Sequence, residues 1–156
     1  MIRRASGAAA AALKSCRHGA DGFVPCGPWH VDAWATTIET MHALLILNDP
    51  PYGTERSYNG LRLALALANT EGTTVRVFLM ADAIACAKPG QTTPDGYYNI
   101  GRMLHGLTSR GVEVGTCGSC MDARGYSDAD LAEGVCRSSM PQLAQWTLWA
   151  DKVITF

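Results

Sequence analysis

Short apolar runs alternate with segments of helical periodicity along most of the chain. The runs at 42–47, 73–80, 112–116, 134–137 and 152–156 have the length and composition of strands. Between them, apolar side chains recur every three or four residues over 58–68, 97–107 and 143–150, which predicts helices, with a shorter one over 128–133. Strands that alternate with helices pack as a parallel sheet covered on both faces. The pattern therefore predicts an α/β fold with a parallel sheet of about five strands.

Polar residues at the ends of these segments predict where the helices begin and end. Thr54 is expected to cap the first helix and Gly72 to end it. Ser139 and Gln142 form a capping-box pattern ahead of the last helix. Ligands of parallel sheets bind beyond the carboxyl ends of the strands. The loops expected to share that rim are 48–54, 81–91 and 117–124.

Residues 1–40 differ in composition from the rest of the chain. The first twenty residues contain four Lys or Arg, no acidic residue and an alanine run, a composition similar to that of a transit peptide. Alternatively, Met41 is the natural start and the preceding residues are an extension. In either case residues 1–40 are expected to be mostly disordered, and residues 41–156 to form one domain. The Cys and His residues within 1–40 fit no common zinc spacing.

Composition limits the classes of function. The chain has 156 residues, 47% hydrophobic and 17% charged, with a net charge of -1, which is ordinary for one globular domain. This balance favours neither nucleic acid nor an anionic membrane as a partner, and no apolar run is long enough to span a bilayer. Six cysteines in a chain of this size indicate free thiols in a reducing, cytoplasmic compartment. No nucleotide-binding glycine loop is present, and no cofactor is expected.

Cys117 lies where the third predicted strand gives way to a short helix. Free N–H groups and the positive dipole end of a helix N-terminus lower the pKa of a cysteine, and the thiolate is the nucleophile of persulfide exchange. Ser119 is expected to cap the following turn and Gly125 to stop it. Cys120 follows three residues on, a spacing that lets it lie on the same side of the turn.

Three other interpretations of the C-x-x-C pair stay open. Half a zinc site would need two more ligands, and the other Cys and His residues of the domain show no paired spacing. Two buried, inert cysteines are the second interpretation. A thioredoxin-like redox motif is the third, although this pair follows the third strand and no downstream cis-proline loop is evident.

A series of short segments carries a family resemblance. In chain order the segments are 48–53 (NDPPYG), 59–64 (NGLRLA), 78–83 (FLMADA), 90–91 (GQ), 94–99 (PDGYYN), 117–125 (CGSCMDARG) and 150–153 (ADKV). Together they resemble the DsrE/DsrF-like family, especially its YchN-like branch, over nearly all of 41–156. Residues 1–40 have no counterpart in it.

This resemblance implies a flavodoxin-like sheet, assembly into trimers or hexamers, and sulfur relay. In such a relay a cysteine accepts sulfane sulfur as a persulfide from a donor and yields it to an acceptor. Cys117 occupies the position of the sulfur-carrying cysteine, whereas Cys120 is a feature of the YchN-like branch. The implied partners are sulfur donor and acceptor proteins or small sulfur compounds, and the protein would be a sulfurtransferase component.

Five further residues are candidates for binding the sulfur compound, and each also has a plainer interpretation. Asp82 ends the second strand and either caps the next turn or orients a group near Cys117. Arg124 either attracts an anionic sulfur species or forms a surface ion pair. The others are Cys86, a partner thiol or a packed residue, and Tyr52 and Asn48, pocket residues or parts of a turn.

Three functions are therefore compared. The first is a sulfur carrier that uses Cys117, with Cys120 releasing the sulfur by forming a disulfide. The second is a thiol–disulfide oxidoreductase that uses the same pair. The third is a non-catalytic, oligomeric ligand-binding module whose function does not depend on these thiols. No metal site is expected in any of the three.

Overall fold

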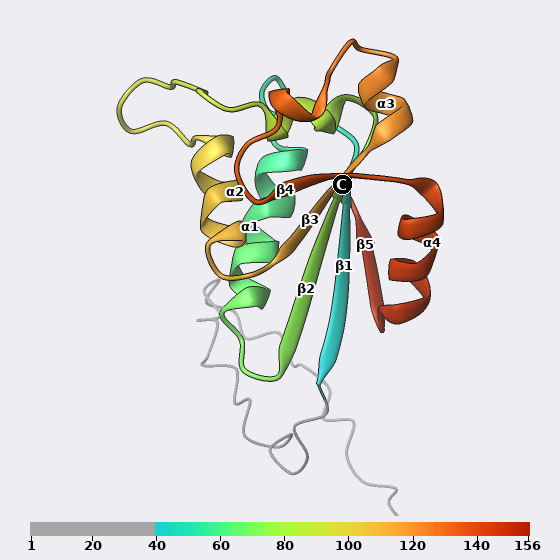
Figure 1. Cartoon of the computed structure of the whole chain (residues 1–156). Coiled ribbons are helices and arrows are strands. Elements are labelled where there is room, and N and C mark those ends of the chain that lie inside the picture. Colours follow the sequence, from blue (N-terminus) through green and yellow to red (C-terminus); the bar gives the residue numbers. More distant parts are fainter. Residues whose placement is uncertain (1–39) are drawn as a thin grey trace, which may run out of the picture. The chain divides into compact units, whose positions relative to one another are not determined.

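The five predicted strands are present in the computed structural model, which describes residues 40–156, and all pair in parallel (Figure 1). They are β1 (Met41–Leu47), β2 (Thr73–Leu79), β3 (Glu113–Cys117), β4 (Val135–Ser138) and β5 (Lys152–Thr155). The helices are α1 (Arg56–Ala68), α2 (Ile100–Thr108), α3 (Gly118–Asp122) and α4 (Met140–Trp149), with the 3-10 helices η1 (Ala81–Ala87) and η2 (Asp128–Asp130). The predicted α/β fold is confirmed.

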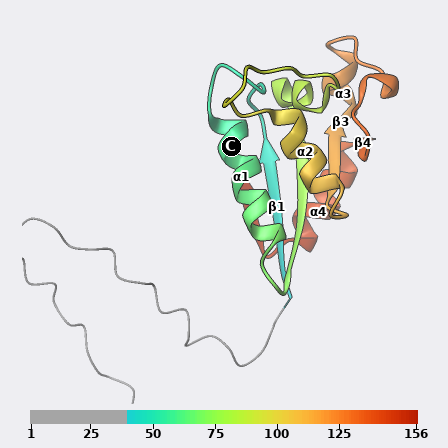
Figure 2. The ribbon, with the colours of Figure 1, turned by 90° about the vertical axis from the view of Figure 1, so that its left-hand side faces the viewer.

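Both faces of the sheet are covered because the chain reverses its direction across the sheet once. The strand order is β4-β3-β2-β1-β5, so β2, β3 and β4 are added successively on one side of β1. The connecting helices α1 and α2 pack on one face, and α4 returns over the opposite face to place β5 beside β1 (Figures 1 and 2). Right-handed crossovers change face when they change direction.

Each face has its own hydrophobic core. Alternation along β1 turns Leu45 and Leu47 towards α1 and α2, whereas Leu44 faces α4. Phe78 of β2 and Trp146 of α4 pack in the α4 core with their rings edge to face at 6.0 Å. Each fully buried leucine or phenylalanine stabilises the fold by about 1.5–3 kcal/mol. The apolar runs at 42–47 and 73–80 therefore correspond to strands covered on both sides, whereas the edge strands β4 and β5 are largely exposed.

Two predicted helix starts are wrong, and local hydrogen bonds explain both. The hydroxyl of Thr54 donates to the carboxylate of Asp49 at 2.9 Å, so Thr54 does not cap α1. The second helix starts after Asn99, because the side chain of Asn99 accepts a hydrogen bond from the N–H of Arg102 at 2.9 Å. The capping of α4 by Ser139 is confirmed.

The predicted disorder of residues 1–40 concerns a segment that, apart from Thr40, lies outside the described residues, as do both interpretations of that segment. Within 40–156, no helix is long and apolar enough to cross a membrane. The rim segment that begins at residue 81, predicted as a loop, opens with η1.

Candidate functional site at the carboxyl end of the sheet

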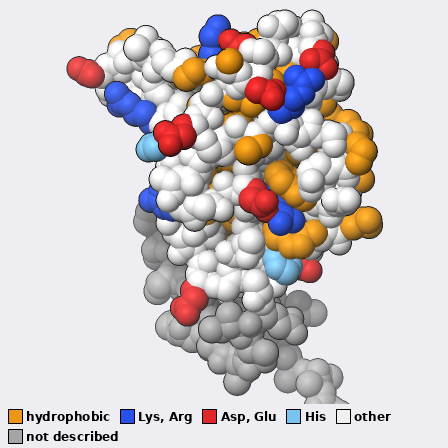
Figure 3. Space-filling view, in the orientation of Figure 1, with side chains coloured by type: hydrophobic (Ala, Val, Ile, Leu, Met, Phe, Trp, Pro, Cys, Tyr) orange, Lys and Arg blue, Asp and Glu red, His pale blue; other side chains and the backbone are white. Residues whose placement is uncertain are grey.

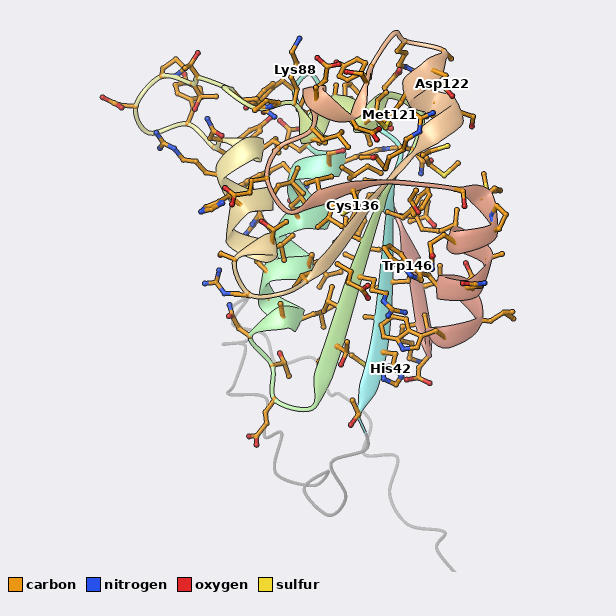
Figure 4. All side chains as sticks on the ribbon, viewed as in Figure 1. His42, Lys88, Met121, Asp122, Cys136 and Trp146 are labelled. Carbon is orange, nitrogen blue, oxygen red and sulfur yellow. The ribbon has the colours of Figure 1, made fainter. Side chains whose placement is uncertain are left out.

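Cys117 is the last residue of β3 and the N-cap of α3, as the sequence predicts. Its α3 neighbours Met121 and Asp122 lie at the carboxyl end of the sheet, whereas His42 marks the opposite end (Figure 4). Thr116, one residue earlier, is fully buried and its hydroxyl donates to the carbonyl of Cys136 at 3.0 Å. The strand end that carries Cys117 is therefore bonded to β4.

Hydrogen bonds, and not the dipole of a long helix, lower the pKa of Cys117. Its side chain is 2% exposed, and Sγ lies 3.3 Å from the hydroxyl oxygen of Ser119. Burial would raise the pKa of Cys117, but the side chains and backbone N–H groups of Ser119 and Cys120 bring that pKa below the ordinary 9.0. Because α3 has only five residues, its dipole is small. Ser119 acts inside α3 and not as its cap, which corrects the prediction.

Cys120 has different surroundings from Cys117. It is half-buried, and its Sγ accepts a hydrogen bond from the backbone N–H of Ala81 at 3.2 Å. Burial and the neighbouring Cys117 raise the pKa of Cys120, against the opposing effects of Ala81 and Arg124. Of the two thiols, Cys117 therefore loses its proton first as the pH rises.

An ion pair joins two of the predicted site residues beside Cys120. Nε and Nη2 of Arg124 donate to Oδ1 of Asp82 at 3.1 and 2.7 Å, and Nη1 donates to the carbonyl of Cys120 at 3.3 Å. Asp82 does not cap η1, whose N-cap is Met80. The pair links the start of η1 to the end of α3, next to the C-x-x-C turn.

A pocket of about 370 Å³ opens beside Cys117 at the ends of β3 and β4. Its lining comprises Cys117, Gly118, Ser119, Arg137, Ser138, Ser139 and Met140. A Cβ on Gly118 would lie 3.0 Å from both Nε of Arg137 and the carbonyl oxygen of Ser138, so a side chain there would crowd this pocket. A larger hollow of about 420 Å³ along β4 includes Cys136 but neither Cys117 nor Cys120. Of these two pockets, only the smaller one is lined by a site cysteine, Cys117.

Sequence reasoning missed Arg137. Its Nη2 donates to both carboxylate oxygens of Asp122, at 2.6 and 2.7 Å, and to the carbonyl of Gly118 at 3.3 Å. The hydrogen bond to Asp122 raises the pKa of Arg137, and the nearby Cys117 contributes in the same direction. The register of β3 and β4, which pairs Cys117 with Ser138, brings Arg137 to the site. No local sequence signal specifies that register.

Three predicted binding residues do not line the pocket beside Cys117 and have structural contacts elsewhere. Cys86 is fully buried in the core under α1 and α2, where desolvation raises its pKa to about 12. The hydroxyl of Tyr52 donates to Gln91 at 2.8 Å, and the side-chain amide of Asn48 donates to the carbonyl of Phe156 at 3.1 Å. Across 40–156, no group of three or more His, Cys, Asp or Glu residues could hold a metal ion.

Comparison with known proteins identifies the family. The model of the DsrE/DsrF-like family matches residues 41–156, nearly three quarters of the chain. The chain belongs to the DsrE/DsrF-like family. It is 46% identical over 114 residues to Protein YchN of Escherichia coli K12, covering 97% of that protein and 72% of this chain. It is also 40% identical over 112 residues to Uncharacterized protein MK0008 of Methanopyrus kandleri, covering 91% of that protein and 72% of this chain.

Solved structures agree with this assignment. The crystal structure of the ychN protein from E. coli superposes with a TM-score of 0.71 at 44% identity, over 74% of this chain and 99% of that one. The Methanobacterium thermoautotrophicum protein MTH1491, of unknown function, has a TM-score of 0.58 at 18% identity, over 74% of this chain and 99% of that one. The second likeness shows the fold alone. Membership of the DsrE/DsrF-like family suggests a sulfur-relay kind of role.

Proposed function

We propose that this DsrE/DsrF-like protein carries sulfane sulfur as a persulfide on Cys117. The supporting observation is a thiol of lowered pKa at the end of a strand, in the lining of a pocket of about 370 Å³. A persulfide carrier needs a thiolate to accept sulfur and a space in which a donor reaches it. The family membership points to the same chemistry.

The loading step is redox-neutral. The Cys117 thiolate attacks the outer sulfur of a donor persulfide, R–S–SH, and a new S–S bond forms at Cys117 Sγ. The bond between the two donor sulfurs breaks, and the donor leaves as the thiolate R–S⁻. The proton stays on the transferred sulfur, so no external oxidant or reductant takes part.

The exposed cysteine of β4 provides a matched control for this assignment. Cys136 is more exposed than Cys117, but it lies outside the pocket that contains Cys117. The reduced full-length chain would be incubated with a low-molecular-weight persulfide and analysed by intact and peptide mass spectrometry. One added sulfur should appear on Cys117, be lost in Cys117→Ser, and persist in Cys136→Ser. Normal loading of Cys117→Ser would refute the proposal.

The proximity of the two site thiols supports a second candidate, thiol–disulfide exchange. Cys117 and Cys120 lie close enough for each to alter the pKa of the other. In this alternative, a substrate disulfide is reduced while a Cys117–Cys120 disulfide forms. Steady turnover of a small disulfide with a regenerating reductant, without persulfide accumulation, would favour this second function.

A homo-oligomer, trimer or hexamer, stays part of the proposal. Three large apolar side chains support it, because they lie exposed on α4 and β5: Met140 at 52%, Leu148 at 89% and Val153 at 44%. Hydrophobic side chains reach the surface on the side of the molecule that carries α4 (Figure 3). Apolar surface of this kind is covered in many assemblies. Sedimentation equilibrium of the full chain would measure the mass of the assembly, and a monomer would contradict it.

A further inference from the structure

The two site thiols both contact the α4 core, but their other surroundings differ. Cys117 lines the pocket between the ends of β3 and β4, and Cys120 is absent from that lining. Cys120 instead contacts the start of η1 through Ala81. It also packs at the margin of the α4 core, among partly buried residues that include Met80 and Ile46. A sulfur atom transferred from Cys117 to Cys120 would therefore move from the pocket at the ends of β3 and β4 to the start of η1.

The contact of Cys120 with the backbone is held by an unusual conformation. Ala81 has a φ of +50°, and within 40–156 it is the one non-glycine residue with positive φ. An L-residue rarely adopts this conformation, which persists only where the surroundings stabilise it. Here it accompanies the hydrogen bond from the Ala81 N–H to Cys120 Sγ at 3.2 Å. An N–H donor stabilises negative charge that develops on that sulfur.

An ion pair stabilises this contact from the adjoining residue. Asp82 follows Ala81 and accepts two hydrogen bonds from Arg124, which also donates to the carbonyl of Cys120. One guanidinium thus fixes the η1 turn and the α3 turn relative to each other. Asp82 and Arg124 do not contact either sulfur in this arrangement, so they are positioning residues.

We infer that Cys120 is a second sulfur-carrying thiol, which takes the sulfane sulfur from Cys117 while its own sulfur is hydrogen-bonded to the Ala81 N–H. This inference rests on the proposed function and extends it to an internal transfer. Sulfur enters at Cys117, in the pocket, and leaves from Cys120, beside η1.

The internal transfer balances without a further reagent. The thiol proton of Cys120 passes to the outer sulfur of the Cys117 persulfide anion, and Cys120 Sγ then bonds to that sulfur. The S–S bond at Cys117 breaks and Cys117 leaves as a thiolate, so the products are the Cys120 persulfide and the Cys117 thiolate. The lowered pKa of Cys117 makes it the better leaving group, and the raised pKa of Cys120 makes it the stronger nucleophile.

The test follows the position of the sulfur with time. The full-length chain is loaded with a low-molecular-weight persulfide, freed of donor, and quenched by alkylation at successive times. Trypsin releases residues 111–124 as one peptide that contains both thiols, and fragment ions between them locate the extra sulfur. The label should appear first on Cys117 and then on Cys120. In Cys120→Ser it should stay on Cys117, and in Cys117→Ser loading of Cys120 should be at least about tenfold slower.

A positioning variant tests the contact with η1. Asp82→Asn should slow the appearance of sulfur on Cys120 several-fold relative to the loading of Cys117. If the unmodified chain loads normally but the sulfur stays on Cys117, the internal transfer is overturned and the carrier function stands. Release of sulfide with formation of a Cys117–Cys120 disulfide would overturn it as well. Absence of sulfur on both thiols would overturn the carrier function itself.

Discussion

The two faces of the sheet each bury a cysteine at the same end of the molecule, with opposite results. Cys86 is 0% exposed under α1 and α2, and its pKa rises to about 12. Cys117 is 2% exposed on the α4 face, and its pKa falls below 9.0. Near-zero exposure of the side chain therefore does not by itself set the pKa of a thiol. Desolvation dominates at Cys86, deep in the core, whereas at Cys117, at the rim of the sheet, the hydrogen bonds of Ser119 and Cys120 outweigh it.

The largest expected effect is a difference in alkylation rate between these two thiols. At pH 8 a thiol with a pKa of about 12 is ionised in roughly one molecule in ten thousand, so native Cys86 should react at least a thousandfold more slowly than Cys117. Peptide mapping after timed iodoacetamide treatment of the reduced chain measures both rates. Equal rates at the two sites would mean that burial and hydrogen bonding do not distinguish them.

The raised pKa of Cys86 should also make the free energy of unfolding fall at high pH. The folded-state pKa of Cys86 is raised, so its contribution to stability is complete below the ordinary value of 9.0 and is lost as the pH rises towards about 12. Over the three pH units from 9 to about 12, at about 1.4 kcal/mol each, the loss totals about 4 kcal/mol, of which about 3 kcal/mol falls below pH 11. Urea unfolding at pH 8 and pH 11 would measure that part.

Cys86→Ala is the control for that measurement, because it removes the titrating thiol from the α1 and α2 core. Its stability at pH 8 should be lower than that of the unmodified chain, owing to the small cavity. Between pH 8 and pH 11 it should lose less stability than the unmodified chain. An identical loss in both proteins would assign the alkaline sensitivity to other groups.

The smallest expected effect concerns Ser119, whose hydroxyl lies 3.3 Å from Cys117 Sγ. Ser119→Ala removes an interaction that lowers the pKa of Cys117, so the midpoint of the pH–alkylation profile should move to higher pH. Ser139→Ala is a matched control, since Ser139 lines the same pocket but caps α4. A shift in the control and none in Ser119→Ala would contradict the assigned contact.

Much of the fold could be predicted because its signals are local. Period-two and helical patterns depend on residues a few positions apart, and they placed the strands and most helices within a few residues of their observed bounds. The errors in helix starts near Thr54 and Asn99 arose where a side-chain hydrogen bond sets the boundary: Thr54 donates to Asp49 and does not cap α1, and Asn99 caps α2.

The sequence by itself determined that Cys117 ends a buried strand and that Cys120 follows it within one turn. Only the tertiary structure decided which groups surround them. The Ala81 N–H comes from 39 residues away, Asp82 pairs with Arg124 across 42, and Arg137 arrives through the register of β4. The same packing separates Cys86 into the opposite core. Strand order and register arise from burial summed over both faces of the sheet, and no short segment encodes that sum.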